Sequence, residues 1–330
     1  MMRRRPEIRL CSHEEEIMDE HEVEFVSDGL RLSGSLALPA GQGPFPGVVF
    51  VAGSGEVDRN ENHKKMQMNA FNELARTLAD RGFASLRFDK RGVGRSEGKF
   101  LTAGFFDNVA DAASALRFLQ GRDEVDSERT FVIGHSEGAL IASRLAGEAI
   151  VPAGVVLIAG TAQRGEDVLA WQAAEVVKHI TGFQGWLIRT LPIDPLKMQK
   201  KLLTKVASST GDTMRVQLVV KLNAKWMREF IAYNPADDLA RSHCPVLAMT
   251  GGNDIQVNPD DVAAMQPIVR GPFEGHVIPG LTHLLREGKP GTADYKRQLK
   301  SPLDHRLKSM VAEWLERHAG SGDYRATRQG

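Results

Sequence analysis

Ser136 lies between two glycines in the stretch GHSEG, residues 134–138, where an apolar run ends and a helical pattern begins. The stretch fits G-x-S-x-G, in which a sharp turn from a buried strand into a helix exposes the serine hydroxyl at the edge of a sheet. The N-terminus of the following helix favours developing negative charge. The alternative is an ordinary strand-to-helix turn whose glycines serve close packing. The partners of Ser136 decide between the two interpretations.

A serine hydroxyl becomes a good nucleophile when a histidine takes its proton and a carboxylate orients that histidine. Asp254 follows the apolar run VLAMTGGN directly, and His283 follows the strand-like run GHVI in the stretch PGLTHLL. The chain order Ser, Asp, His is the order expected when such an elbow lies in a mostly parallel sheet. The sequence therefore predicts a catalytic triad of Ser136, Asp254 and His283.

The remaining acids and histidines are predicted to have structural roles. Asp260 and Asp261 begin the next helical pattern, where a carboxylate caps backbone N–H groups. His276 lies in a predicted strand, and His305 and His318 lie on the terminal helix. His135 precedes the nucleophile, and its side chain is predicted to point away from the position of the base.

Acyl transfer also needs hydrogen-bond donors for the oxyanion. The backbone N–H of Glu137, directly after the nucleophile, is predicted to supply one. The second is predicted to be the backbone N–H of Ser54, in the loop GSGEVDRNEN that follows the apolar run GVVFVA. Asp58 and Arg59 in this loop either brace it by an ion pair or touch substrate, and bracing is the favoured interpretation.

The elements that must position these residues follow an alternating pattern. EVEFVSDGLRLSGSLALP alternates apolar and polar residues around Asp28-Gly29, which is typical of an antiparallel hairpin. Buried strand patterns then alternate with helical patterns at 68–81, 106–119 and 138–146. Alternating strands and helices predict an α/β fold with a mostly parallel, doubly wound sheet.

Residues 165–232 interrupt this rhythm, with several helical patterns and no convincing strand. Strand and helix patterns then resume to the end of a last helix near residue 319. The predicted core is discontinuous and consists of residues 21–164 and 233–319. Residues 165–232 are predicted to form one helical insertion, and residues 1–20 and 320–330 to be flexible ends. Five insertion residues are predicted to form mostly its own core, with some facing a pocket: Trp171, Phe183, Trp186, Trp226 and Met227.

The composition excludes several classes of protein. The 330 residues carry 42 basic and 42 acidic side chains, so the zero net charge gives no reason to expect nucleic acid or an anionic membrane as a partner. No apolar run is long enough for a membrane span or a secretion signal. Two cysteines, Cys11 and Cys244, do not suggest a disulfide framework. A cytoplasmic location is expected, and a homo-oligomer is compatible with the sequence.

Neither a cofactor nor a metal is expected. RGVGRSEG, residues 91–98, misses the spacing of a dinucleotide-binding loop and is interpreted as a turn in which Asp89 and Arg91 bond the backbone. The acidic run SHEEEIMDEHE, residues 12–22, is interpreted as solvated surface.

Four motifs in this order, GSG…DRN, FDKRGVGRS, GHSEG and GGNDIQV, resemble those of the α/β-hydrolase family, and more closely its bacterial serine-hydrolase and carboxylesterase branch. The resemblance covers most of residues 23–318. It implies Ser136 as nucleophile, Asp254 as acid, His283 as base and an oxyanion loop at Gly53–Ser54. It also implies that the insertion 165–232 is a helical cap over an acyl pocket.

The expected activity is hydrolysis of small-molecule carboxylic esters, with small or medium acyl groups, through an acyl-enzyme. A serine at the elbow argues against dehalogenase and epoxide-hydrolase chemistry, which use an aspartate there. Thioesterase, lactonase and aminopeptidase activities use the same triad and stay open; a peptidase would need an acid for the substrate amine, such as Glu166, Asp167 or Glu175. The other class is a non-catalytic scaffold, but such proteins usually lack a triad member.

Overall fold

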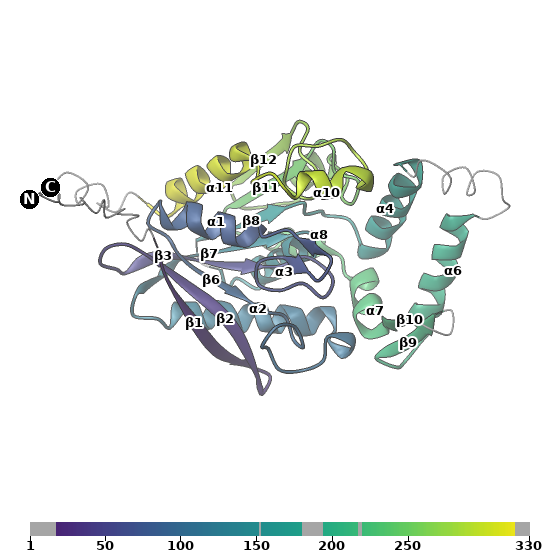
Figure 1. Ribbon diagram of the computed structural model, residues 1–330, viewed down its shortest axis with the longest axis horizontal. Helices are drawn as coiled ribbons and strands as arrows, with labels where there is room; N and C mark the ends of the chain where they lie inside the picture. Colours follow the sequence, from purple (N-terminus) through teal and green to yellow (C-terminus); the bar gives the residue numbers. More distant parts are fainter. Residues whose placement is uncertain (1–17, 152, 180–193, 217–219, 321–330) are drawn as a thin grey trace, which may run out of the picture.

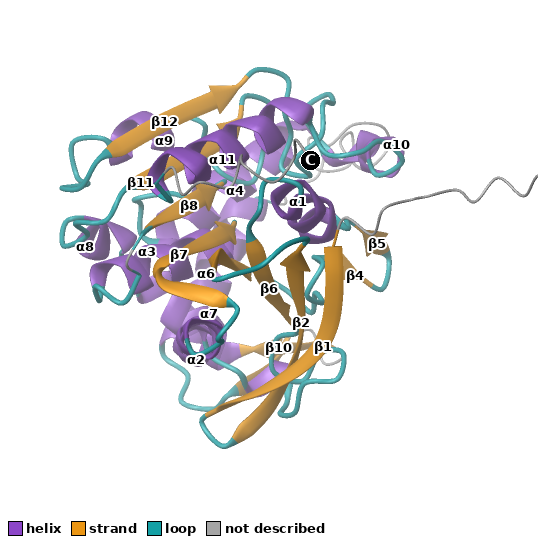
Figure 2. Cartoon of the chain, turned by 90° about the vertical axis from the view of Figure 1, so that its left-hand side faces the viewer, coloured by secondary structure: helices purple, strands orange, loops and turns teal. Residues whose placement is uncertain are grey.

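The computed structural model describes residues 18–151, 153–179, 194–216 and 220–320. Within these residues, eight strands form one sheet in the order β1-β2-β6-β3-β7-β8-β11-β12. The strands of this sheet are β1 Met18–Ser27, β2 Leu30–Pro39, β3 Phe45–Val51, β6 Ala84–Phe88, β7 Val125–His135, β8 Gly154–Ile158, β11 Val246–Gly251 and β12 Phe273–Ile278. Figure 2 shows β1 and β12 at opposite edges of the twisted sheet.

Only the first two strands of this sheet run antiparallel to their neighbours. β1 pairs with β2 from Met18↔Pro39 to Ser27↔Leu30, and β2 pairs antiparallel with β6, whereas the strands from β6 to β12 pair in parallel. Asp28 and Gly29 both have positive φ, 47° and 78°, as a tight hairpin turn of this kind requires. The predicted hairpin is therefore confirmed, but its first strand begins at Met18, so residues 18–20 belong to the sheet and not to a flexible end.

Helices cover both faces of the sheet (Figure 1). On one face α1 and α11 pack over the side chains of Phe50, Phe131 and Ile133. On the other, α2 and α3, together with α8 and α9, pack over Val49, Val132 and Leu157. These helices are α1 Ala70–Ala79, α2 Phe105–Gln120, α3 Glu137–Gly147, α8 Pro235–Leu239, α9 Asp261–Met265 and α11 His305–His318. Because β3, β8 and β11 are buried along their whole length, they appear in the sequence as nearly continuous apolar runs.

The described part of the segment 165–232 lies to one side of the sheet, beyond α3 (Figure 1). It contains α4 Gly165–His179, α6 Pro195–Ala207 and α7 Ala224–Ala232, with a small antiparallel pair, β9 Thr213–Val216 and β10 Val220–Asn223. The prediction that this segment has no strand was wrong; its strands are only four residues long and too exposed to show an apolar pattern. Phe183 and Trp186 lie outside the described residues.

The remaining short elements lie in the loops. They are the two-stranded ribbon β4 Asn62–His63 and β5 Met66–Gln67, 3-10 turns at Phe100–Thr102 and Thr292–Asp294, and α10 Tyr295–Gln298. Among the residues described, no helix is both long and apolar enough to cross a membrane.

Candidate active site

Ser136 forms the sharp turn between β7 and α3. Its backbone has φ 54° and ψ −117°, a conformation that a residue with a side chain rarely adopts, and its N–H donates to the carbonyl of Ile158 at 2.9 Å. A Cβ at Gly134 would lie 2.0 Å from the carbonyl oxygen of Gly138, and a Cβ at Gly138 would lie 1.9 Å from that of Val51. The two glycines are therefore required by close backbone approach, and the half-buried serine is held in a strained turn, as G-x-S-x-G predicts.

The predicted base and acid are in contact. His283 Nδ1 lies 2.8 Å from Asp254 Oδ2, and both side chains are buried. The other oxygen of Asp254 accepts the backbone N–H groups of Gln256 at 2.7 Å and Val257 at 3.0 Å. These bonds hold the carboxylate in place, and the carboxylate in turn orients the imidazole with Nε2 as the ring nitrogen left for catalysis.

His135 contacts the base, contrary to the prediction that it points away. Its ring centre lies 4.8 Å from that of His283, with the two planes tilted by 40°. Alternation along β7 places His135 on the same face as Phe131 and Ile133, under α1 and α11, and His283 reaches that face from the loop after β12. The sheet thus places His283 beside the residue that precedes Ser136.

Glu61 forms a buried pair with His135. His135 Nδ1 lies 3.0 Å from Oε1 and 2.9 Å from Oε2 of this carboxylate, and both residues are at most 3% exposed. Burial opposes a charge on the ring, but the Glu61 carboxylate outweighs it, with a smaller contribution from Asp254, and raises the pKa of His135. The ring whose pKa is raised in this way lies directly against the imidazole of His283.

The predicted oxyanion loop packs against the elbow. A Cβ at Gly53 would come within 3.4 Å of both the Ser136 Cβ and the carbonyl oxygen of His135. Ser54 and Glu137 line the same cavity as Ser136. As the first residue of α3, Glu137 has an N–H without a partner inside the helix. Both residues that carry the predicted backbone donors therefore line this cavity.

The side chain of Glu137 is fully engaged below the cavity. Its carboxylate accepts Lys90 Nζ at 3.0 Å, the amide of Asn108 at 2.9 Å and the indole N–H of Trp226 at 2.7 Å. Trp226 comes from α7 and stacks on Phe230 with ring centres 4.8 Å apart. The residue after the nucleophile is thus bonded to the β6–α2 region and to the segment 165–232.

Two cavities meet around Trp226. One, of about 50 Å³, contains Ser136 and is lined by Leu140, Val168, Leu169 and Val257. The other, of about 270 Å³, is lined mainly by apolar side chains from the 3-10 turn at residues 100–102 and from β10, including Phe100, Leu101 and Leu222. Ser54, Glu137 and Trp226 line both. Of the three shared residues, Trp226 has the largest side chain between the small and the large compartment.

The competing acids and histidines have structural contacts, although not all as predicted. Asp261 does not cap its helix; its buried carboxylate accepts the side-chain amide of Gln163, and burial raises the pKa of its carboxyl group. Asp260 makes no side-chain cap bond either. His276 lies in β12 beside Glu274, and α11 carries the two other histidines at its ends. The bracing role of Arg59 is confirmed, since it pairs with Asp89 at 2.8 Å and with Glu22 at 2.9 Å.

In the turn after β6, the prediction that Asp89 bonds the backbone is confirmed, and the same prediction for Arg91 was wrong. Asp89 accepts the backbone N–H of Arg59, whereas Arg91 bonds the carboxylates of Asp111 and Asp28 and not the backbone. Among the described residues, no group of three or more histidine, cysteine, aspartate or glutamate side chains is arranged to hold a metal.

Two contributors to the site, Glu61 and Lys90, were not predicted from the sequence, and Trp226 was predicted only as one of five insertion residues of which some face a pocket. Lys90 follows the end of β6 at the same edge of the sheet as Ser136, and that position is the one signal that could have identified it. Glu61 and Trp226 reach the site from a loop and from the segment 165–232, whose placement no local pattern encodes.

Comparison with known proteins identifies the family. A family model described as serine aminopeptidase, S33, matches residues 62–288. The chain belongs to this family. Esterase EstD of Thermotoga maritima is 28% identical over 287 residues, which are 86% of this chain and 65% of EstD, so the chain spans slightly less than two thirds of that relative.

Solved structures show the same fold. Est1E of Butyrivibrio proteoclasticus, solved with ferulic acid bound, has a TM-score of 0.60 at 19% identity, over 90% of this chain and 98% of Est1E. The Pyrococcus furiosus esterase Pf2001 has a TM-score of 0.59 at 17% identity, over 92% of each chain. The chain thus has the α/β-hydrolase fold, as the sequence motifs predicted.

Proposed function

We propose that this protein is a carboxylic ester hydrolase with Ser136 as its nucleophile. The strained elbow beside the buried Asp254–His283 pair is the observation that carries the proposal. The similarity to esterase EstD supports the same activity.

The mechanism follows from the positions of these groups. Ser136 Oγ attacks the ester carbonyl while His283 Nε2 takes its proton, and Asp254 stabilises the imidazolium at Nδ1. The N–H groups of Ser54 and Glu137 bind the oxyanion. His283 then protonates the leaving alcohol, and after that it activates a water molecule that releases the acid from Ser136.

The segment 165–232 is proposed to act as a cap over the acyl pocket, between the core segments 21–164 and 233–319. Its ends meet, because the N–H of Gly165 donates to the carbonyl of Tyr233 at 3.1 Å. Its helix α7 covers the site through the Trp226–Glu137 bond. A small-molecule ester with one compact and one larger apolar group would fit the two compartments.

Aminopeptidase activity is the second candidate because of the family description, but the lining of the cavities argues against it. A peptidase of this kind needs a carboxylate free to bind the α-amine of its substrate. Of the described carboxylates, only Glu137 lines the two compartments, and it already accepts three donors, one of them the ammonium of Lys90. Glu166 and Asp167 are exposed on α4, and Glu175 pairs with Lys178.

A series of p-nitrophenyl esters from acetate to palmitate, with a panel of aminoacyl p-nitroanilides, tests the proposal. Ester turnover is expected, and Ser136→Ala is expected to lower kcat by at least about 10⁴-fold. Ser143→Ala is the matched control, because this buried serine on α3 bonds only the carbonyl of Ala139. Anilide turnover without ester turnover would establish the aminopeptidase instead. A cytoplasmic location completes the proposal and is tested by cell fractionation.

A further inference from the structure

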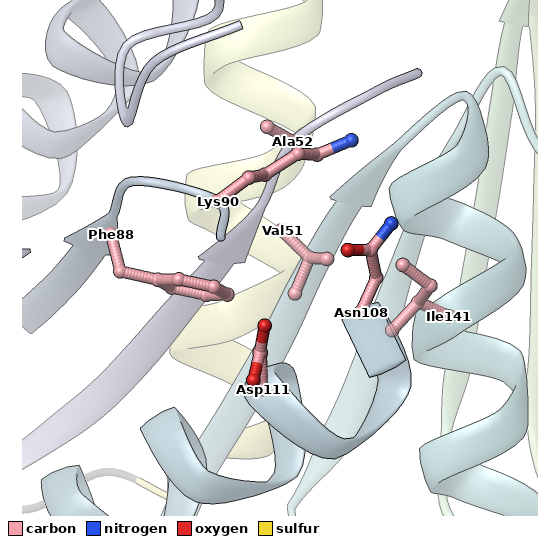
Figure 3. A pocket seen from close by; sticks show the side chains of 7 residues that line it. All are labelled: Val51, Ala52, Phe88, Lys90, Asn108, Asp111 and Ile141. Atoms are coloured by element: carbon pink, nitrogen blue, oxygen red, sulfur yellow. The ribbon is translucent and has the colours of Figure 1, made fainter. Parts of the chain in front are cut away.

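Lys90 holds the peptide group that carries the predicted oxyanion donor. Its ammonium donates to the carbonyl oxygen of Gly53 at 2.5 Å and to Glu137 at 3.0 Å, and the side chain is buried. Figure 3 shows that Lys90 and Asn108 both carry their nitrogen atoms to one end of a small internal cavity, with Asp111 at the other end. The cation is therefore directed to the loop and the elbow.

The geometry of the peptide bond gives this contact a consequence for Ser54. The Gly53–Ser54 bond is trans, and in a planar trans peptide the C=O of one residue and the N–H of the next point in opposite directions. When Lys90 fixes the direction of the Gly53 carbonyl, it also fixes the direction of the Ser54 N–H. That N–H then points away from Lys90, and Ser54 lines the cavity that contains Ser136.

Glu61 holds the preceding peptide group. Its Oε1 accepts the N–H of Gly53 at 2.8 Å, and Glu61 itself has a positive φ of 62° although it is neither glycine nor exposed. A buried carboxylate on a strained backbone is kept only where its surroundings impose it. Gly53 is thus bonded at its N–H by an anion and at its carbonyl by a cation.

We propose that Lys90, assisted by Glu61, is a positioning residue that aims the Ser54 N–H at the substrate oxyanion. The proposal rests on the proposed ester hydrolysis. Lys90 does not touch substrate in this role; it acts through one peptide plane. A loop without this cation is free to rotate that plane, so that the second oxyanion donor is lost.

The test is Lys90→Met, which keeps an unbranched side chain only one atom shorter and removes the ammonium. Loss of one oxyanion donor is expected to lower kcat by about 10²–10³-fold with little change in KM. An alkyl trifluoromethyl ketone, whose hemiketal with Ser136 places an oxyanion in the same position, is expected to bind more weakly by a similar factor. If Lys90 had a purely structural role, kcat and the affinity for the ketone would not fall by similar factors.

Arg144→Met is the matched control. This substitution removes a cation that pairs with the buried Asp238, whose carboxylate still accepts Tyr233 and Arg241. In the same way, Lys90→Met leaves the Glu137 carboxylate with two donors, Asn108 and Trp226. Arg144→Met is expected to leave kcat and ketone binding unchanged. If Lys90→Met does not fold, the double variant Lys90→Met/Glu137→Gln removes both charges and is expected to show the same catalytic loss.

Folded Lys90→Met with kcat and ketone affinity within about threefold of the wild type would overturn the proposal, as would a rise in KM at unchanged kcat. The wild type and Ser136→Ala are measured in the same series. An inactive wild type would refute the ester hydrolase itself, whereas an active wild type beside an unaffected Lys90→Met refutes only the role of Lys90.

Discussion

Gly138 allows α3 to pack against the end of β3, and a single methyl group would prevent it. A Cβ there would lie 1.9 Å from the backbone oxygen of Val51, which cannot move without disturbing the oxyanion loop. Gly138→Ala is expected to cost at least about 1–3 kcal/mol of unfolding free energy and to abolish labelling of Ser136 by a fluorophosphonate. Urea denaturation and labelling measure the two effects.

The control for that substitution is Gly121→Ala. A Cβ at Gly121 meets nothing closer than 3.4 Å, and the residue has φ −82°, which alanine adopts without strain. If Gly138→Ala were as stable and as reactive towards the fluorophosphonate as Gly121→Ala, the claim that close packing at the elbow requires Gly138 would be wrong.

The His135–Glu61 pair predicts a pH dependence of stability. The pKa of His135 is raised in the folded protein, so its stabilising contribution is fully present below the unfolded pKa of about 6.5 and is lost as the pH rises through the folded value. The stability difference between the wild type and His135→Gln is therefore expected to shrink as the pH rises above that range. Urea titrations at a series of pH values measure it, and a constant difference would contradict the charged pair.

At this scale, the residues that follow buried strands were predictable. Ser136 and Asp254 each follow a buried apolar run that is visible in the sequence, His283 follows the partly exposed edge strand β12, and parallel strands bring their carboxyl ends to one edge. The orientation of His135 was not predicted, because the prediction considered only its neighbour Ser136 and not which face of β7 its ring occupies. Glu61 was missed because nothing in the local sequence marks a buried carboxylate on a loop.

Among the elements, α7 fastens the segment 165–232 to the core at the site. Asn223 caps α7 by accepting the N–H of Trp226 at 2.9 Å, and its amide donates to the carbonyls of Phe100 and Ala103 at 2.9 and 2.7 Å. Asn223→Ala is expected to cost about 2–4 kcal/mol, from the lost cap and two lost hydrogen bonds, and to raise KM. Asn234→Ala is the control, since Asn234 begins α8 without a side-chain cap bond. Equal denaturation midpoints for the two variants would count against this fastening role.

The position of Trp226 on α7 predicts how the compartments select substrates. Trp226→Ala joins the two cavities and is expected to raise kcat/KM for octanoate relative to acetate esters by about tenfold. Trp226→Phe loses the bond to Glu137 but keeps a ring between the compartments, so its preference is expected to stay close to that of the wild type. An unchanged preference in Trp226→Ala would show that the indole does not divide the site.

Elements of the sheet were predictable from the sequence, and those of the insertion only in part. β3, β8 and β11 are buried on both faces, so hydrophobicity alone marks them. β9 and β10 are held by pairing with each other and are mostly exposed, so their apolar pattern is weak. The start of β1 at Met18 was missed because the charged residues 19–22 pair with β2 through backbone bonds rather than through apolar side chains.

For the molecule as a whole, the balance of charges predicts its behaviour in solution. With 42 acidic and 42 basic residues, repulsion between molecules is weakest near neutral pH. Light scattering is expected to show the lowest solubility within about one unit of pH 7, and improvement on either side. Solubility that is highest at pH 7 would indicate that exposed patches, rather than net charge, control association.

The strained backbone of Ser136 also implies that the fold would be more stable without its nucleophile. A residue with a side chain at φ 54° and ψ −117° loses about 1–3 kcal/mol of folding free energy to strain. Glycine avoids this strain, and part of the gain is offset because glycine has more conformational freedom in the unfolded chain. Ser136→Gly should therefore be more stable than Ser136→Ala, which keeps the strain, although neither has a hydroxyl. Reactivity at this turn and resistance to unfolding are then opposing demands on one residue, and the sequence GHSEG favours reactivity.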